Sequence, residues 1–218
     1  EYYNAIGKKY RKCIKSFNEK KSVSYKYNKS PKKLKIGFVS GDFSNHSVGH
    51  FLIDLIKNLN SNSLELYAYN NNNFGEDDLK SEFKKYFNYW RNIFDKNDFT
   101  VCNIIREDGI HILIDLSGHT LHNRLALFVN RPAPIQATWL GCNISTCIPE
   151  INYIIGDKYA FNENDQEYFV EKIWHFPEVM QCLSEQKFKL EKKEIPLFKN
   201  NYITFGSFNT GSKFNENL

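Results

Sequence analysis

The segment IHILIDLSGHTLHNRLALFVNRPAPIQATWLG, residues 110–141, contains a strand, a short helix and a second strand in close succession. Residues 110–118 form an almost unbroken apolar run, which is typical of a strand buried on both faces of a sheet. Residues 122–130 predict a short helix, which RPAP closes before strand signals resume at residues 135–141. Because a strand, a helix and another strand at this spacing favour parallel pairing, the segment places the chain in the α/β class.

Strand and helix signals continue to alternate on both sides of this segment. Such alternation predicts a parallel sheet with helices on both faces. The Asn run in NNNNFGEDD, residues 70–78, is interpreted as a turn with mild low complexity. The predicted strands are residues 34–40, 64–70, 88–94, 110–118, 135–141, 152–159 and 172–180, and the predicted helices are residues 2–17, 47–60, 77–87, 98–109, 122–130 and 165–172.

Three parts are predicted along the chain. Residues 1–33 form a helix and a polar linker, residues 34–195 form the sheet domain, and residues 196–218 open a second domain. In the last part, YITFGSFNTGSKF, residues 202–214, reads as a strand, a turn of small residues and the start of a helix. The chain begins with Glu1 instead of Met, and we expect it to be a piece of a longer protein.

The composition favours a soluble domain over a nucleic-acid or membrane protein. The 218 residues are 41% hydrophobic, which is enough for a substantial core, and the net charge of +4 is mild. The Lys clusters are interpreted as solvated surfaces, so no nucleic acid is expected as a partner. No apolar run approaches the roughly 20 residues of a membrane span. Five Cys without CxxC spacing predict a reducing, cytoplasmic location.

Polar residues gather directly after three of the predicted strands. SGDFSNH follows the strand at residues 34–40, DLSGHTLHNR follows the strand that begins at residue 110, and LGCNIST follows the strand that begins at residue 135. In parallel sheets, ligands bind beyond the carboxyl ends of the strands. The sequence therefore predicts a His-rich cleft at this edge of the sheet.

The stretch GDFSNHSVGH, residues 41–50, allows a metal site as one interpretation. His46 and His50 are four residues apart, so a helix would present them on one face, and His119 could supply a third zinc ligand. However, Ser47 stands where the HExxH motif has Glu. We therefore expect no metal.

The alternative is a polar turn at the start of a helix. Ser44 or Asn45 would cap that helix, and His50 would pack inward. His46 would lie in the first turn, where the helix dipole disfavours imidazolium, so that a neutral ring could act as a hydrogen-bond partner or base. Asp42, just past the strand, could orient His46 or take a proton itself.

Two further signals concern anions. Arg124 could pair with a carboxylate or a phosphate, or it could form an ion pair within the protein surface. FGSFNTGSK, residues 205–213, lacks Walker A spacing, but a strand, a small-residue turn and a Lys before a helix suit an anion. A sheet domain with a polar cleft, facing a second domain with an anion-binding turn, suggests a nucleotide-sugar transferase.

The motifs taken together resemble the O-linked N-acetylglucosamine transferase family, which includes SPINDLY-like proteins and bacterial glycosyltransferases with tetratricopeptide repeats. LKIGFVSGDFSNHSVGHFL, RPAPIQATWLG, INYIIGD and ITFGSFNTGSK occur in the family's order, over residues 34–213. The resemblance implies a GT-B fold with two Rossmann-like halves. It also implies inverting, metal-independent transfer of N-acetylglucosamine from a UDP-sugar to Ser or Thr of a protein acceptor, with no cofactor.

The resemblance also assigns roles to residues. Asp42 and His46 match the family's cleft Asp and His, and Lys213 matches the Lys that steadies the diphosphate leaving group. Thr210 lies where the family contacts the uridine diphosphate. The full set expected to bind substrate is Asn45, His119, Thr120, Arg124, Leu140, Gly141 and Thr210.

Two departures from the family pattern stand against full activity. WLGCNISTC has Cys147 where the family loop ends in Gly, which puts the backbone geometry of that loop in question. Tyr3 replaces a family His in the linking helix. Because most of the C-terminal half is missing, we expect this fragment alone to be inactive. The alternatives are a related transferase of fucose, or of glucose to Asn, and a non-catalytic scaffold.

Overall fold

The computed structural model divides the chain into two compact units, residues 1–184 and residues 185–218. Within the predicted N-terminal helix, the three residues described are helical. The structure describes residues 5, 8, 12, 25, 30–59, 61–162, 164–183, 191, 193–208 and 211.

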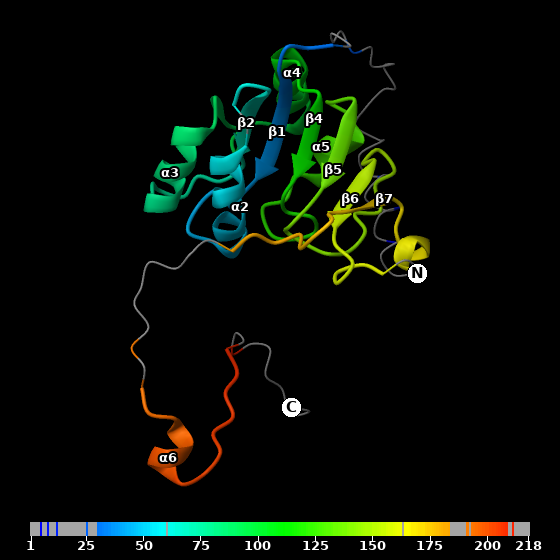
Figure 1. Cartoon of the computed structure of the whole chain (residues 1–218). Helices are drawn as coiled ribbons and strands as arrows, with labels where there is room; N and C mark the ends of the chain where they lie inside the picture. Colours follow the sequence, from blue (N-terminus) through cyan, green and yellow to red (C-terminus); the bar gives the residue numbers. More distant parts are fainter. Residues whose placement is uncertain are drawn as a thin grey trace. The chain divides into compact units, whose positions relative to one another are not determined.

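The first unit is built on one sheet of seven parallel strands in the order β3-β2-β1-β4-β5-β6-β7 (Figure 1). β1 pairs with β2 over their full length, from Leu34 opposite Leu64 to Ser40 opposite Asn70. This doubly wound order confirms the predicted α/β, Rossmann-like sheet. The strands are β1 (Leu34–Ser40), β2 (Leu64–Asn70), β3 (Tyr89–Asn92), β4 (Ile112–Asp115), β5 (Ile135–Thr138), β6 (Tyr153–Gly156) and β7 (Lys172–His175).

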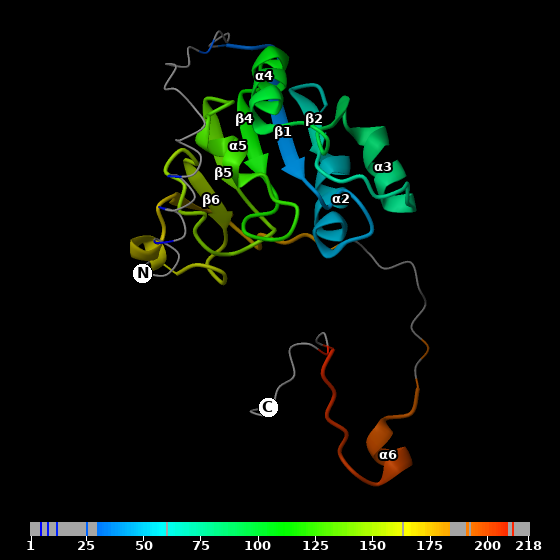
Figure 2. The ribbon, with the colours of Figure 1, turned by 180° about the vertical axis from the view of Figure 1, so that it is seen from behind.

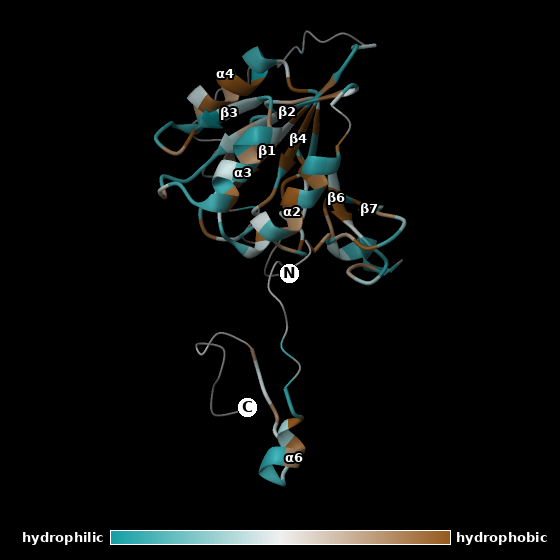
Figure 3. Ribbon diagram, turned by 60° about the vertical axis from the view of Figure 1, so that its left-hand side comes forward, coloured by the Kyte–Doolittle hydropathy of each residue, from teal (hydrophilic) through white to brown (hydrophobic). Residues whose placement is uncertain are grey.

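Helices pack on both faces of the sheet, as the alternation predicts. α2 (Ser47–Asn58) and α3 (Asp78–Tyr86) share one apolar cluster with the sheet, and α4 (Asp98–Asp108) and α5 (Leu125–Val129) share another. Figure 2 gives the view from behind, and Figure 3 shows the hydrophobic colour concentrated on the strands and on parts of α2 and α4. The sheet is thus the middle of three layers, which explains the long apolar runs of β1 and β4.

The apolar cluster that α2 and α3 share with the sheet extends into the turn that follows β1. Phe43, in that turn, is fully buried and meets Phe83 of α3 and Phe87 edge-on, with ring centroids 5.6 Å and 5.5 Å away. Such aromatic pairs add about 0.5–1.5 kcal/mol beyond area burial. The turn that carries Asp42 is therefore anchored to the core through the next residue.

Residues at the ends of α4 explain why its predicted bounds are correct. The side chain of Asn97 caps the helix by accepting from the backbone N–H of Thr100 at 2.9 Å. At the other end Gly109 takes a left-handed φ of 68° and donates its N–H to the carbonyl oxygen of Arg106 at 3.1 Å. Glycine adopts this conformation without steric cost, which is why the helix stops there.

Several strands are shorter than the sequence-based expectation. β5, expected over residues 135–141, ends before Leu140, whose φ of 74° is left-handed. β6, expected over residues 152–159, ends before Asp157, whose carboxylate accepts from Tyr159 N and Ala160 N. β3 and β7 are also shorter than their expected ranges, residues 88–94 and 172–180.

β4, α5 and the helix expected at residues 165–172 differ as well. β4 ends at Asp115 because the carboxylate of that residue turns the chain by accepting from the following backbone N–H groups. α5 begins at Leu125 because His122 has a left-handed φ of 62°. The helix predicted at residues 165–172 is only a 3₁₀ turn, η1 (Asp165–Tyr168). The side chain of Gln166 donates to the carbonyl oxygen of Glu171 and accepts from the N–H of Ile173. These bonds hold the extended chain that leads from η1 into β7.

The second unit contains one short helix, α6 (Pro196–Asn200). The strand predicted from residue 202 is not formed over the described residues 202–208. A strand requires a hydrogen-bonded neighbour, and the part of this unit that the structure describes contains no other strand. In the described residues, no helix is long and apolar enough to cross a membrane.

Candidate active site at the carboxyl edge of the sheet

The predicted polar segments converge because the strands before them are neighbours. The chain leaves β1 toward β2 and β3, then returns to β4 on the other side of β1. The point between β1 and β4 is therefore a topological switch, where α/β sheets bind ligands. The segments after β1, β4 and β5 all begin at this edge (Figure 1).

Asp42 provides the carboxylate at this edge. Its side chain is only 14% exposed, and its Oδ1 lies 3.7 Å from Nδ1 of His46. Burial raises the pKa of the Asp42 carboxyl, and the positive charges of His46 and His122 oppose that rise. A carboxyl group with a raised pKa in a crevice is suited to accept a proton.

His46 is the N-cap of α2, which corrects the expectation that Ser44 or Asn45 caps the helix and that His46 lies in the first turn. Its Nδ1 accepts from the backbone N–H of Val48 at 3.3 Å. Histidine caps less often than Ser or Asn, so the sequence gave no strong reason to choose it. In the neutral ring, this bond places the proton on Nε2. In that tautomer the Nδ1 atom 3.7 Å from Oδ1 of Asp42 is an acceptor, and the donor of this half-exposed ring is Nε2.

His50 does not pack inward as expected. Its ring is half-buried, and its Nε2 lies 2.8 Å from Oδ1 of Asn45. The backbone N–H of Asn45 in turn donates to the carboxylate of Asp77, the N-cap of α3, at 3.0 Å. His50 and Asn45 thus brace the turn between β1 and α2 against α3.

The Asn run that begins at the last residue of β2 connects neighbouring loops through side-chain hydrogen bonds. Asn70, Asn71 and Asn72 are all at most 6% exposed. Asn72 Nδ2 donates to the carbonyl oxygen of Gly41, and Asn71 Nδ2 donates to that of His122 at 2.8 Å. The description of this run as low complexity did not predict these contacts, because each amide bonds a group that is distant in sequence.

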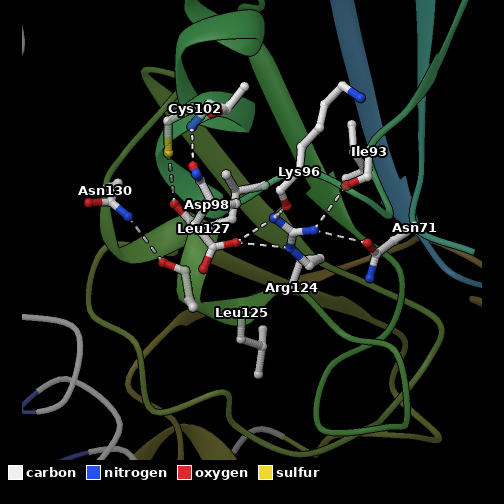
Figure 4. A network of polar contacts seen from close by, with 12 residues as sticks. Asn71, Ile93, Lys96, Asp98, Cys102, Arg124, Leu125, Leu127 and Asn130 are labelled. Carbon is white, nitrogen blue, oxygen red and sulfur yellow. Dashed lines mark hydrogen bonds and ion pairs between the residues drawn. The ribbon is translucent and has the colours of Figure 1, made fainter. Parts of the chain in front are cut away.

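Arg124 forms an ion pair with Asp98 within the protein, which is one of the two possibilities that the sequence left open. Its five N–H donors make five hydrogen bonds, two of them to Asp98 at 2.9 Å and 2.6 Å and one to Asn71 at 3.0 Å (Figure 4). The other two go to the carbonyl oxygens of Ile93 and Lys96. Since all five donors are used, none is free for a phosphate in this conformation. Arg124 therefore supports the loop after β4 from behind.

The loop after β4 is held by a second buried carboxylate. Asp115 is fully buried and accepts from Ser117 N, Gly118 N and the hydroxyl of Thr138. His119 and Thr120, expected to bind substrate, follow this turn. His119 Nε2 lies 3.2 Å from the carbonyl oxygen of Ser145 and thereby links the loops after β4 and β5. Thr120 is exposed, and its hydroxyl donates to the carbonyl oxygen of Ser117.

Leu140 and Gly141 form a tight crossing between the β4 and β5 loops. Leu140 is buried with a left-handed φ of 74°. A Cβ on Gly141 would overlap the carbonyl oxygen of Leu116 and lie 2.7 Å from Cα of Ser117. Only glycine allows this approach of two backbones. Leu140 and Gly141 therefore set the shape of the edge, and their expected role in substrate binding stays a prediction.

Cys147 keeps the backbone conformation that a glycine would favour, with φ at 58°. The loop is fixed by Glu171, a buried residue that the sequence did not single out. Its carboxylate accepts a hydrogen bond from the hydroxyl of Ser145 at 2.7 Å. It also accepts from the backbone N–H of Thr146 at 2.8 Å and from the Thr146 hydroxyl. The departure at Cys147 is thus accommodated, because contacts on both sides of it hold the loop.

The remaining predicted positions lie outside the described residues. These are Thr210, Lys213 and Tyr3. Within the described part of the chain, no group of three or more His, Cys, Asp or Glu is arranged to hold a metal ion. His46, His50 and His119 in particular do not form the zinc set considered above.

Comparison with known proteins gives the family. Residues 2–199 match the family described as Glycosyl transferase family 41. The chain belongs to glycosyltransferase family 41. In solved structures, a variant of the Thermobaculum terrenum O-GlcNAc transferase matches with 33% identity and a TM-score of 0.67, over 69% of this chain and 29% of that chain. This match agrees with the predicted GT-B relationship.

Family 41 relatives from plants are also similar to this chain. The "Probable UDP-N-acetylglucosamine--peptide N-acetylglucosaminyltransferase SPINDLY" of Hordeum vulgare is 35% identical over 185 residues, which cover 83% of this chain and 19% of that protein. The SEC protein of Arabidopsis thaliana is 27% identical over 75% of this chain and 16% of its own length. The chain therefore spans about a fifth of the curated relatives that it matches.

Proposed function

We propose that the protein containing this chain transfers N-acetylglucosamine from UDP-GlcNAc to Ser or Thr of proteins. Membership of family 41 and the names of its relatives support this donor and acceptor. The observation on which the proposal rests is the half-buried carboxyl of Asp42, with its raised pKa, at the switch point of the sheet. In the proposed mechanism, the acceptor hydroxyl approaches this carboxyl.

The proposed reaction is a single inverting displacement. The acceptor oxygen bonds to the anomeric carbon as the bond to the diphosphate oxygen breaks, and the hydroxyl proton goes to Asp42. The Nε2–H of His46 would donate a hydrogen bond to the bound substrate. UDP leaves with the bonding electron pair, and Lys213 stabilises its developing negative charge. No metal takes part.

The proposed organisation assigns residues 34–195 to the N-terminal catalytic half and residues 196–218 to the start of the UDP-binding half. Residues 1–33 would link the catalytic core to upstream tetratricopeptide repeats. A chain with only the first half would be inactive, because the leaving-group side is incomplete. The free thiols of Cys102, Cys142, Cys147 and Cys182 support a reducing, cytoplasmic location.

Two alternatives remain for the test to separate. A related enzyme could transfer fucose, or glucose to Asn, and the donor pocket outside this chain would decide. A non-catalytic scaffold is favoured by the Cys147 and Tyr3 departures. The left-handed φ of Cys147 keeps a conformation that glycine would adopt, which weakens the first of these two arguments; the second concerns a residue outside the described part of the chain.

The test is release of UDP or GDP by the complete gene product, incubated with an acceptor protein extract and each sugar nucleotide in turn. The proposal predicts activity with UDP-GlcNAc that persists in EDTA and is lost in Lys213→Ala. Activity only with GDP-fucose or UDP-glucose would replace the sugar assignment. Absence of activity with every donor would favour the scaffold.

A further inference from the structure

Glu171 is a buried carboxylate whose hydrogen-bond partners are neutral. It immediately precedes β7 and is 1% exposed. Its oxygens accept from the hydroxyl of Ser145 and from the N–H and hydroxyl of Thr146, in the loop after β5. In the described part of the chain, no Lys, Arg or His lies within ion-pair distance of it. A buried carboxylate costs free energy unless hydrogen bonds compensate, and here the compensating bonds come from two consecutive residues of one loop.

One peptide unit connects Glu171 to the loop after β4. The N–H of Thr146 and the carbonyl of Ser145 belong to the same planar, trans peptide, so the two groups point in opposite directions. Oε1 of Glu171 accepts from the N–H end at 2.8 Å. At the other end, Nε2 of His119 lies 3.2 Å from the carbonyl oxygen. The direction of that carbonyl, and hence the place where the imidazole bonds, therefore depends on Glu171.

The hydroxyl of Ser145 holds the same peptide unit through its side chain. It donates to Glu171 at 2.7 Å and accepts from the N–H groups of Cys147 at 3.1 Å and Val170 at 3.3 Å. A hydroxyl has one proton and two lone pairs, so these three bonds use its full capacity. Ser145 therefore cannot rotate without breaking bonds to the loop after β5 and to the segment before β7.

The bond to Ser145 determines the state of the His119 ring. A carbonyl oxygen only accepts, so Nε2 of His119 carries the proton, and the neutral ring takes the Nε2–H tautomer. The ring is half-buried, and the backbone before it is held by Asp115, which accepts from Gly118 N at 2.8 Å. His119 is thus fixed through its backbone and through its ring, at the carboxyl edge of the sheet.

We propose that Glu171 is a positioning residue for His119, which it aims and keeps in one tautomer through the peptide unit of Ser145 and Thr146. The substrate that His119 contacts rests on the proposed function, whereas the hydrogen-bonded path from Glu171 does not. Both candidate ligands, the sugar nucleotide and the acceptor, carry hydroxyl groups, which imidazole binds by hydrogen bonding. A ring that is already fixed in its bound orientation binds such a group without the entropy loss of ordering the side chain.

Glu171→Ala tests the proposal, and NMR of the histidine rings in the 218-residue chain reports the tautomer of His119. In the wild type, we expect the neutral ring to carry its proton on Nε2. In Glu171→Ala, the peptide unit is no longer held, so both tautomers should be populated. Asp157→Ala is the matched control, because Asp157 is also buried and also accepts three hydrogen bonds, from backbone N–H groups. Both variants should unfold at lower urea, but only Glu171→Ala should change the His119 ring.

Kinetics of the complete gene product identify the ligand of His119. In Glu171→Ala, the KM of one substrate should rise about tenfold with kcat nearly unchanged, because a misaligned ring weakens binding. A rise for UDP-GlcNAc assigns His119 to the sugar nucleotide, and a rise for the peptide assigns it to the acceptor.

Four results would overturn the proposal: a wild-type ring protonated on Nδ1, a tautomer unchanged in Glu171→Ala, an equal change in Asp157→Ala, or KM values equal to those of the wild type. The first of these needs no variant, so it decides even where Glu171→Ala folds poorly. A wild-type protein inactive with every sugar nucleotide overturns the proposed function instead, while the ring signals still decide the role of Glu171.

Discussion

Replacement of Arg124 by Ala tests whether this residue supports the site from inside the protein. The side chain of Arg124 is 12% exposed and donates five hydrogen bonds. The variant leaves the carboxylate of Asp98 and the amide oxygen of Asn71 without these donors. Because Asn71 also bonds His122, the defect should reach the turn that holds Asp42.

The size of the effect follows from burial. Breaking a buried ion pair by removing one partner costs about 3–5 kcal/mol. Asp98 is 35% exposed and can be rehydrated, so the lower end, about 3 kcal/mol, applies here. With a urea m-value of about 2 kcal/mol/M, the unfolding midpoint should fall by about 1.5 M. Arg124→Lys should restore less than half of this loss, because one ammonium cannot replace a planar fork.

Lys84→Ala provides a control for urea unfolding of the same chain. Lys84 also pairs with a carboxylate, Glu76 at 2.5 Å, but the two side chains are 39% and 57% exposed. Its loss should shift the unfolding midpoint far less, because exposed ion pairs contribute little and the remaining carboxylate stays hydrated. Equal midpoint shifts for Arg124→Ala and Lys84→Ala would refute the argument that burial and five bonded donors distinguish Arg124.

Three further predictions concern the same edge of the sheet. In urea unfolding, the free energy of unfolding of Cys147→Gly should exceed that of Cys147→Ala by about 1 kcal/mol, because only glycine adopts the left-handed φ without strain. The reverse order would contradict the inference that position 147 is strained. Gly141→Ala should cost at least about 2 kcal/mol in the same assay, while Gly75→Ala, whose Cβ meets nothing within 4 Å, should stay within about 0.5 kcal/mol. Because the pKa of Asp42 is raised in the folded state, its ionisation opposes folding at pH 7. Asp42→Asn should therefore be more stable than the wild type at pH 7, and the gain should vanish as pH falls below about 3.9; a constant difference across pH would contradict the burial argument.

Local signals were sufficient for most of the fold. The bounds of β1 and β2 match the prediction because each apolar run is bordered by polar turns, and α4 ends at Gly109 as expected. The errors in β4 and η1 occur where a side chain bonds backbone groups two to seven residues further along the chain. Asp115 shortens β4, and Gln166 bonds the chain after η1, effects that no periodicity reveals.

The sequence predicted the location of the candidate site but only some of the residues that form it. The switch-point rule located Asp42 and His46 correctly after β1, because it depends only on strand order. Glu171 and the Asn run after β2 were missed because their roles consist of contacts between segments far apart in sequence. The left-handed φ of His122 was missed as well, although His adopts this conformation more often than most residues with a Cβ.

The most direct test of the central claim is the mass of a Ser- and Thr-containing acceptor peptide after incubation with the complete gene product and UDP-GlcNAc. We predict the addition of one N-acetylhexosamine, lost when Ala replaces the acceptor Ser or Thr and strongly reduced in Asp42→Asn. A peptide mass that does not change with the wild-type protein, or an equal yield from Asp42→Asn, would contradict the account.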